Sequence, residues 1–290
     1  MTVPIAAPAL YHRVLVAGPQ TRPPLLLLHG FTGDRRSWLG FAAAWRRLQP
    51  AGDGADGHHR KVQRQLIALD LPGHGRSPQP SEPAARTMSG VVAAVLASMD
   101  ALDIARAHVL GYSMGGRVAL SLALAAPERV ASLSLVGASP GIADAAERDA
   151  RAAADDALAA RLEAEGLPAF VARWMAQPLF ASQARLDPGV LARERRRRLE
   201  QSPWGLAESL RRVGTGRMPP LWAALERLAM PCVFLAGAED ARFLGIGQAM
   251  AARSRRIVLH PVPGAGHAAQ LEQPDWVAER VRSFLEASET

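Results

Sequence analysis

The chain has 290 residues, 49% of them hydrophobic and 21% charged, which is ordinary for a globular domain that carries an insertion. The longest aliphatic run is Leu25–Leu28 and the first ten residues lack a signal-peptide pattern, so we expect a cytoplasmic protein with no membrane partner. The formal net charge is +7, but the arginines are spread over many predicted helices without interleaved aromatic residues, so no nucleic-acid partner is expected. A single cysteine, Cys232, excludes an intrachain disulfide.

Short apolar runs alternate with helical patterns along the first half of the chain. Several runs are apolar throughout, as expected for strands that are buried on both faces of a parallel sheet. The predicted strands are Arg13–Ala17, Leu25–His29, Gln65–Leu71, His108–Tyr112, Ser132–Gly137, Cys232–Ala236 and Ile257–Val262. The predicted helices are Trp38–Leu48, Met88–Leu102, Gly115–Ala125 and Trp276–Leu285. This order predicts an α/β fold with a mostly parallel central sheet and helices on both faces.

The alternation stops at about residue 142, and a helical pattern rich in Ala, Arg, Glu and Leu continues to about residue 221. Breaks at Gly166–Pro168, Asp187–Gly189 and Ser202–Pro203 divide this stretch into about four short helices. A helical block inserted between strands can cover their carboxyl ends, where ligands bind in such sheets. The predicted organisation is a core in two parts with a helical cap between them: residues 1–141, 142–221 and 222–290.

A second insertion is predicted at Ala51–Arg64, a segment rich in Gly, Asp and His that lies between a helix and a strand. We expect it to affect surface and oligomer contacts rather than chemistry. Metal binding by Asp53, Asp56, His58 and His59 is a less favoured alternative. No dinucleotide-binding or Walker loop is present in the sequence, and we expect neither a metal nor another cofactor.

The strongest chemical signal is Gly111-Tyr112-Ser113-Met114-Gly115-Gly116, which follows an apolar strand and precedes a helical pattern. This is the G-x-S-x-G nucleophile elbow in the strand–turn–helix context that it requires. Ser113 is therefore the predicted nucleophile position, on a strained turn that exposes its hydroxyl group.

Two loops are candidates for the oxyanion donors of such a site. In this fold one donor follows the nucleophile and the other lies in the loop after an earlier strand, here His29-Gly30-Phe31-Thr32-Gly33. The predicted donors are the backbone N–H groups of Phe31 and Met114. His29 is expected to brace the loop rather than act as an acid or base.

The acid and the base of a triad should follow later strands, in the order Ser, Asp or Glu, His. Asp240, in Gly237-Ala238-Glu239-Asp240, is the predicted acid, and Glu239 is the alternative. His267, in Gly264-Ala265-Gly266-His267, is the predicted base. His267 would take the proton from Ser113 or act through it, and Asp240 would orient and support His267.

The many arginines have two interpretations. They reflect the general amino-acid composition of the source organism's proteins, or a few of them contact an anionic substrate. Arg117 lies one helical turn after Ser113 and can hold a carboxylate, with a structural salt bridge as the alternative. The run Arg193–Arg198 is expected to be mostly a solvated helix face, with one or two side chains facing inward.

Taken together, these residues resemble the family of 2-succinyl-6-hydroxy-2,4-cyclohexadiene-1-carboxylate (SHCHC) synthases of menaquinone biosynthesis. The resemblance covers nearly the whole chain. Its most specific parts are the elbow Gly111–Arg117 and the cap segments Trp174–Gln183, Gly205–Arg211 and Gly214–Gly216. The Ala51–Arg64 insertion is longer than the family pattern.

The resemblance implies a lyase and not a hydrolase. The implied reaction removes pyruvate from 2-succinyl-5-enolpyruvyl-6-hydroxy-3-cyclohexene-1-carboxylate (SEPHCHC), with His267 and Ser113 acting together as the base. It also implies that Arg117, Arg151 and an arginine of the run, Arg198, bind the carboxylates of this small polycarboxylate substrate. Tyr112 and Trp174 match aromatic positions that line the family site.

Two other functions remain open on the sequence alone. One is a hydrolase of esters or carbon–carbon bonds with the same triad, and the other is a catalytically inactive binding protein on the same fold. The sequence permits a monomer or a homodimer.

Overall fold

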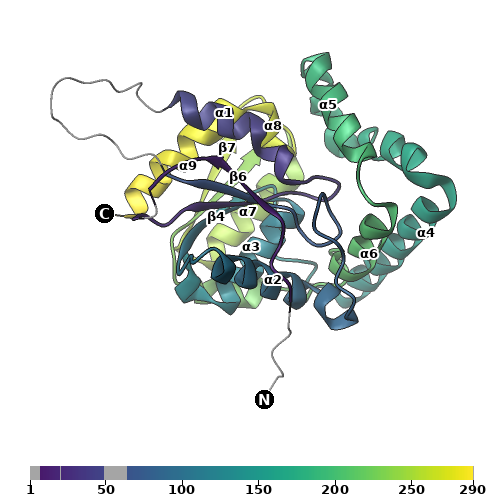
Figure 1. Cartoon of the computed structure of the whole chain (residues 1–290), viewed down its shortest axis with the longest axis horizontal. Coiled ribbons are helices and arrows are strands. Elements are labelled where there is room, and N and C mark those ends of the chain that lie inside the picture. The colour runs from purple at the N-terminus through teal and green to yellow at the C-terminus, as the bar shows by residue number, and fades with distance from the viewer. Residues whose placement is uncertain (1–6, 20, 49–63, 290) are drawn as a thin grey trace.

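A seven-stranded sheet forms the centre of the molecule (Figure 1). The structure is a computed structural model that describes residues 7–19, 21–48 and 64–289. The strands, in spatial order, are β1 (His12–Val16), β3 (Leu66–Leu69), β2 (Leu25–Leu28), β4 (Ala107–Tyr112), β5 (Val130–Val136), β6 (Cys232–Gly237) and β7 (Ile257–Val262). β1 pairs antiparallel with β3, and every other pair is parallel. The predicted α/β fold and its strands are confirmed.

The central strands are buried and largely apolar because helices cover both faces of the sheet. All four residues of β2 are buried, and Leu25 lies between Leu66 of β3 and His108 of β4 in the register. Cys232 is also fully buried, and its thiol is free. Burial raises the pKa of this thiol well above its usual range.

The helices of the core lie in two layers. One face of the sheet packs on α1 (Leu39–Arg47), α8 (Ala269–Glu272) and α9 (Pro274–Ser288). The other face packs on α2 (Met88–Ala101), α3 (Met114–Ala125) and α7 (Ala241–Arg253). Short 3₁₀ turns join them: η1 (Arg35–Trp38), η2 (Pro83–Arg86), η3 (Pro127–Arg129) and η5 (Trp222–Arg227). The four predicted helices of the core are confirmed, while α7 and α8 were not predicted.

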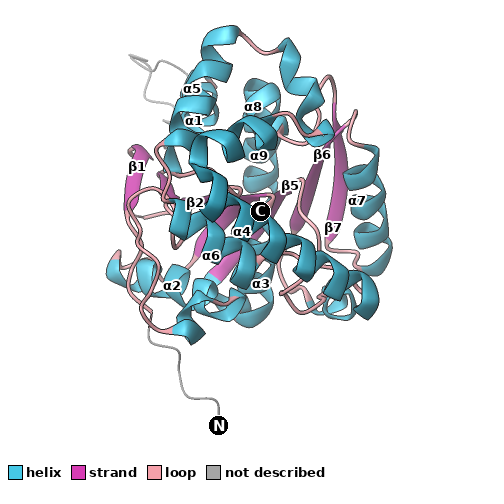
Figure 2. Ribbon diagram, turned by 90° about the vertical axis from the view of Figure 1, so that its right-hand side faces the viewer, coloured by secondary structure: helices cyan, strands magenta, loops and turns pink. Residues whose placement is uncertain are grey.

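The segment between β5 and β6 is helical, as predicted, and it lies to one side of the sheet (Figures 1 and 2). It contains α4 (Ala145–Met175), η4 (Pro178–Arg185), α5 (Pro188–Leu199) and α6 (Pro203–Val213). We call residues 142–221 the cap. Each predicted break has a local cause, because Gly166 has a positive φ of 83° and the side chains of Asp187 and Ser202 cap the two helices that follow.

The cap has a small apolar core of its own and a tight seam with the sheet domain. Buried residues of α4 and α6 pack together, and Phe31 from the sheet domain packs against them. At the seam, Gln201 accepts a hydrogen bond from the N–H of Gly75 (2.9 Å) and donates one to Asp34 (3.1 Å).

The predicted insertion at 51–64 lies outside the described residues, except for Arg64. The guanidinium of Arg64 forms an ion pair with Glu289 near the carboxyl end of the chain. Among the helices of the described residues, none has the length and the apolarity needed to cross a membrane.

A methyl group at the seam should destabilise the protein. A Cβ on Gly205 would lie 2.2 Å from the carbonyl oxygen of Gly73, so Gly205→Ala should lower the free energy of unfolding by about 1–3 kcal/mol. The control is Gly40→Ala in α1, where no atom lies within 4 Å of the added Cβ and a helix former should leave stability unchanged or higher. Chemical denaturation of both variants checks this. Equal stabilities would contradict a close-packed seam.

Candidate active site

Ser113 lies on a strained turn between β4 and α3. Its backbone has φ 51° and ψ −109°, a conformation that side-chain-bearing residues rarely adopt. The N–H of Ser113 donates to the carbonyl oxygen of Val136 (2.9 Å), which ties the turn to the neighbouring strand. The flanking glycines are needed for space, because a Cβ on Gly111 would lie 2.4 Å from the oxygen of Gly115, and one on Gly115 would lie 2.1 Å from that of Leu28.

The structure brings Ser113, Asp240 and His267 together. Nε2 of His267 lies 3.2 Å from Oγ of Ser113, and Nδ1 lies 3.0 Å from Oδ2 of Asp240. A neutral imidazole that donates from Nδ1 to the carboxylate leaves Nε2 free to accept the serine proton. Glu239, the alternative acid, instead forms an ion pair with Arg185 (2.8 Å).

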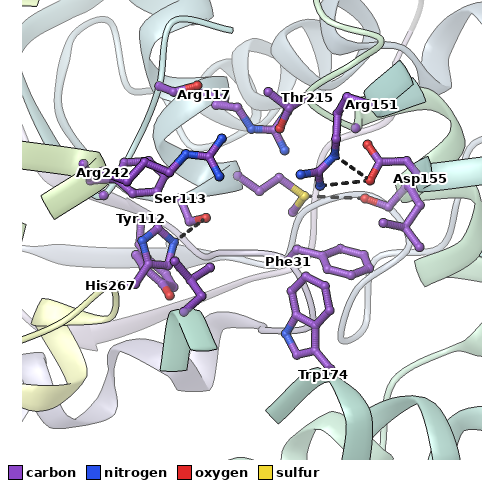
Figure 3. Close-up of a pocket in the computed structure, with 18 of the residues that line it drawn as sticks. Phe31, Tyr112, Ser113, Arg117, Arg151, Asp155, Trp174, Thr215, Arg242 and His267 are labelled. Carbon is purple, nitrogen blue, oxygen red and sulfur yellow. Dashed lines mark hydrogen bonds and ion pairs between the residues drawn. The ribbon is translucent and has the colours of Figure 1, made fainter. Parts of the chain in front are cut away.

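A cavity of about 130 Å³ opens beside Ser113 and His267 (Figure 3). Aromatic side chains form one part of its wall and cationic side chains another. The ring of Trp174 meets the ring of Phe31 edge to face, with 5.1 Å between the centroids. The ring centroid of Tyr112 lies 5.4 Å from that of His267. Tyr112 and Trp174 therefore both line the cavity, at the positions that the resemblance implied.

The two predicted oxyanion donors also line this cavity. Neither the N–H of Phe31 nor that of Met114 donates to an acceptor within residues 7–19, 21–48 and 64–289. Both donors are therefore free to hydrogen-bond to a substrate oxygen beside Ser113.

Two of the predicted arginines, Arg117 and Arg151, line the cavity. Arg151 forms an ion pair with the buried Asp155 (2.9 Å), drawn as dashed lines in Figure 3. Arg117 donates to the carbonyl oxygen of Val213 and has no carboxylate partner in the described part of the chain. Burial lowers the pKa of the Arg117 guanidinium to about 10, and the charge of Asp155 opposes that change. The guanidinium stays charged at neutral pH.

Arg198 does not reach this cavity, which corrects the expectation that it lies with Arg117 and Arg151. It is buried on α5 and pairs with Glu194 one helical turn earlier (3.0 Å), as does Arg197. These three side chains line a separate cavity of about 20 Å³ on the other side of Phe31 and Tyr112. Only these two arginines of the run are buried, which confirms that one or two face inward.

Arg242 and Phe243 line the cavity although sequence analysis did not select them. They stand on the first turn of α7, two and three residues after Asp240. Their closeness to Asp240 in the sequence could have selected them, because residues that follow a catalytic acid stay at the same edge of the sheet.

His29 and His74 brace the loops beneath the site. Nε2 of His29 accepts from the N–H of Leu71 (2.9 Å), and its Nδ1 contacts the carbonyl oxygen of Gly30 (2.8 Å). Burial lowers the pKa of His29 to about 4 and that of His74 to about 3, so both rings are neutral at neutral pH. The predicted bracing role of His29 is confirmed.

Comparison with known proteins places the chain in a family. The model of the alpha/beta hydrolase fold matches residues 23–274, and the chain belongs to this family. A Klebsiella pneumoniae (strain 342) protein named 2-succinyl-6-hydroxy-2,4-cyclohexadiene-1-carboxylate synthase is 34% identical over 89% of this chain and 91% of its own. A Serratia proteamaculans (strain 568) protein of the same name is 31% identical over 94% and 97%.

The same likeness extends to solved structures. The structure of MenH from S. aureus superimposes with a TM-score of 0.86 and is 30% identical, with 96% of this chain and 99% of the other covered.

The backbone around His267 is held by a carboxylate, which gives a testable prediction. Glu272 accepts hydrogen bonds from the N–H groups on both sides of His267, those of Gly266 (2.8 Å) and Ala268 (3.2 Å). Glu272→Ala removes both, so the imidazole should drift from Ser113. We expect labelling of Ser113 by a fluorophosphonate, followed by mass spectrometry, to slow by about 10–100-fold. Glu286→Ala, at an exposed ion pair on α9, is the control and should label at the wild-type rate. Equal labelling rates for Glu272→Ala and the wild type would show that Glu272 does not hold His267 in place.

Proposed function

We propose that this chain is an SHCHC synthase, a lyase that eliminates pyruvate from SEPHCHC. The observation that carries the proposal is a serine–histidine–aspartate triad beside a cavity whose wall holds Arg117, Arg151 and Arg242. Of these three guanidinium groups, only that of Arg151 has a carboxylate partner within the described residues. A substrate with several carboxylates supplies the missing negative charge, whereas a neutral ester does not.

The names of substrate and product define the bonds that change. The substrate has one ring double bond at carbon 3 and the enolpyruvyl ether at carbon 5, and the product is the 2,4-diene. A proton therefore leaves carbon 2, which is acidic because it lies next to the succinyl ketone. The ring double bond shifts, the carbon 5–oxygen bond breaks, and enolpyruvate departs and becomes pyruvate when its methylene carbon takes up a proton. The step needs no water, oxidant or reductant.

The residues of the site have distinct tasks in this step. His267 takes the carbon 2 proton through Ser113, and Asp240 stabilises the imidazolium that forms. The N–H groups of Phe31 and Met114 receive the negative charge that develops on the ketone oxygen. No acyl-enzyme is required. Arg117 and Arg151 bind substrate carboxylates, and Figure 3 shows Arg151 across the cavity from His267. Arg198 pairs with Glu194 in the neighbouring small cavity, which shares Tyr112 and Phe31 with the first, so it does not bind a substrate carboxylate directly.

A hydrolase of esters or carbon–carbon bonds is the second candidate. The same triad and the same free N–H donors suit attack on a carbonyl group. The two candidates differ in their products, because only elimination releases pyruvate and a diene in equal amounts.

The test is an assay of the purified protein with freshly generated SEPHCHC, following SHCHC absorbance and released pyruvate. We expect equal amounts of both products and a fall of at least about 100-fold in rate for Ser113→Ala. Hydrolysis of an aryl ester that depends on Ser113, with no turnover of SEPHCHC, would establish the hydrolase instead.

Loss of a cavity arginine should weaken substrate binding. Arg117→Gln removes a charged donor in a buried wall, so kcat/KM for SEPHCHC should fall by about 10–150-fold. Arg212→Gln is the matched control, because Arg212 lies on α6 outside the cavity and is about half exposed. If both variants lose the same amount of kcat/KM, the carboxylate-binding role of Arg117 is wrong.

A further inference from the structure

Arg242 is a cationic side chain of the cavity whose charge the fold does not neutralise. It is exposed, and it forms no ion pair with any carboxylate of the described residues. Its recorded contact is with the ring of Phe243, where the guanidinium carbon lies 5.9 Å from the centroid. The neighbouring acidic residues are committed elsewhere, since Asp240 faces His267 and Glu239 pairs with Arg185.

The backbone position of Arg242 is also unfavourable for a cation. It stands on the first turn of α7, a helix of 13 residues whose first turn contains no acidic residue. The amino end of a helix carries partial positive charge, so an arginine there needs an anion close by, and the N-cap Asp240 supplies one carboxylate, which accepts from the N–H of Phe243 (3.2 Å). The same carboxylate also faces His267, so the cation on this turn is placed to meet a further anion in the cavity.

The position of Arg242 in the cavity identifies which carboxylate it meets. In Figure 3 its guanidinium lies on the side of Ser113 and His267, while Arg151 and Asp155 lie across the cavity. Arg242 is exposed at the rim, whereas Arg117 is largely buried in the wall. Arg242 therefore shares with Ser113 and His267 the side of the cavity where the bond to the leaving group breaks in the proposed reaction.

We propose that Arg242 binds the carboxylate of the leaving enolpyruvyl group, and so forms a site for free pyruvate. This rests on the proposed lyase function. The guanidinium then balances the carboxylate as negative charge develops on the departing enol oxygen, before a proton added to the methylene carbon completes pyruvate. The class of ligand is a small 2-oxo monocarboxylate.

The test is product inhibition by pyruvate in the SHCHC absorbance assay, with direct binding of pyruvate to Ser113→Ala measured by calorimetry. Arg242→Gln should raise the pyruvate inhibition constant by about 10-fold or more, and Arg242→Lys should restore part of that loss by restoring the charge. The matched control is Arg253→Gln on the last turn of the same helix, where the side chain stacks on Trp222 outside the cavity. Its inhibition constant should equal that of the wild type.

The outcomes separate this inference from the proposed function. If the wild type makes SHCHC and pyruvate but Arg242→Gln keeps the wild-type inhibition constant, the site at Arg242 is wrong while the lyase stands. An equal rise in Arg242→Gln and Arg253→Gln also overturns it. If the wild type does not turn over SEPHCHC, the proposed lyase function is wrong, and the inference on Arg242 that rests on it falls with it.

Discussion

The strained backbone of Ser113 is the constraint on which the rest of the site depends. A residue with φ 51° and ψ −109° persists only where its surroundings hold it there. Here β2, β4 and α3 approach so closely that Gly111 and Gly115 admit no side chain. That close approach points the hydroxyl of Ser113 at His267 and leaves the first N–H of α3 free beside it. The parallel sheet thus fixes both the proton-transfer pair and one anion donor.

The second constraint is electrostatic. The sheet edge supplies one acid, Asp240, which is committed to His267, and the cap supplies Asp155, which is committed to Arg151. Arg117 and Arg242 are left without carboxylate partners in the described chain, and for the buried guanidinium of Arg117 this is costly. An anionic ligand relieves that cost. Triad and charge together therefore favour elimination from a polycarboxylate over hydrolysis of a neutral ester.

The sequence predicted the parts of the site that follow from strand ends. Ser113 and Asp240 follow the buried strands β4 and β6, His267 follows the partly exposed edge strand β7, and parallel strands bring their carboxyl ends to one edge. Helix α7 was not predicted because Gly245 and Gly247 weaken its helical pattern, and Arg242 was missed with it.

The position of Arg198 could not be predicted from the run of arginines. Which side chains of a cap helix face inward depends on how the cap packs, and the pairing of two arginines with Glu194 keeps Arg198 in a separate cavity. Helical spacing alone does not determine which of these arginines face inward; tertiary packing does. The same holds for the cap seam, where Gln201 joins loops that are distant in sequence.

The measurement that tests the central claim most directly is a single-turnover comparison of SEPHCHC with SEPHCHC deuterated at ring carbon 2. If His267 and Ser113 remove that proton as the pyruvate leaves, the deuterated substrate reacts more slowly, and SHCHC and pyruvate slow together. Equal rates for the two substrates, with pyruvate released in the absence of SHCHC, would contradict the account.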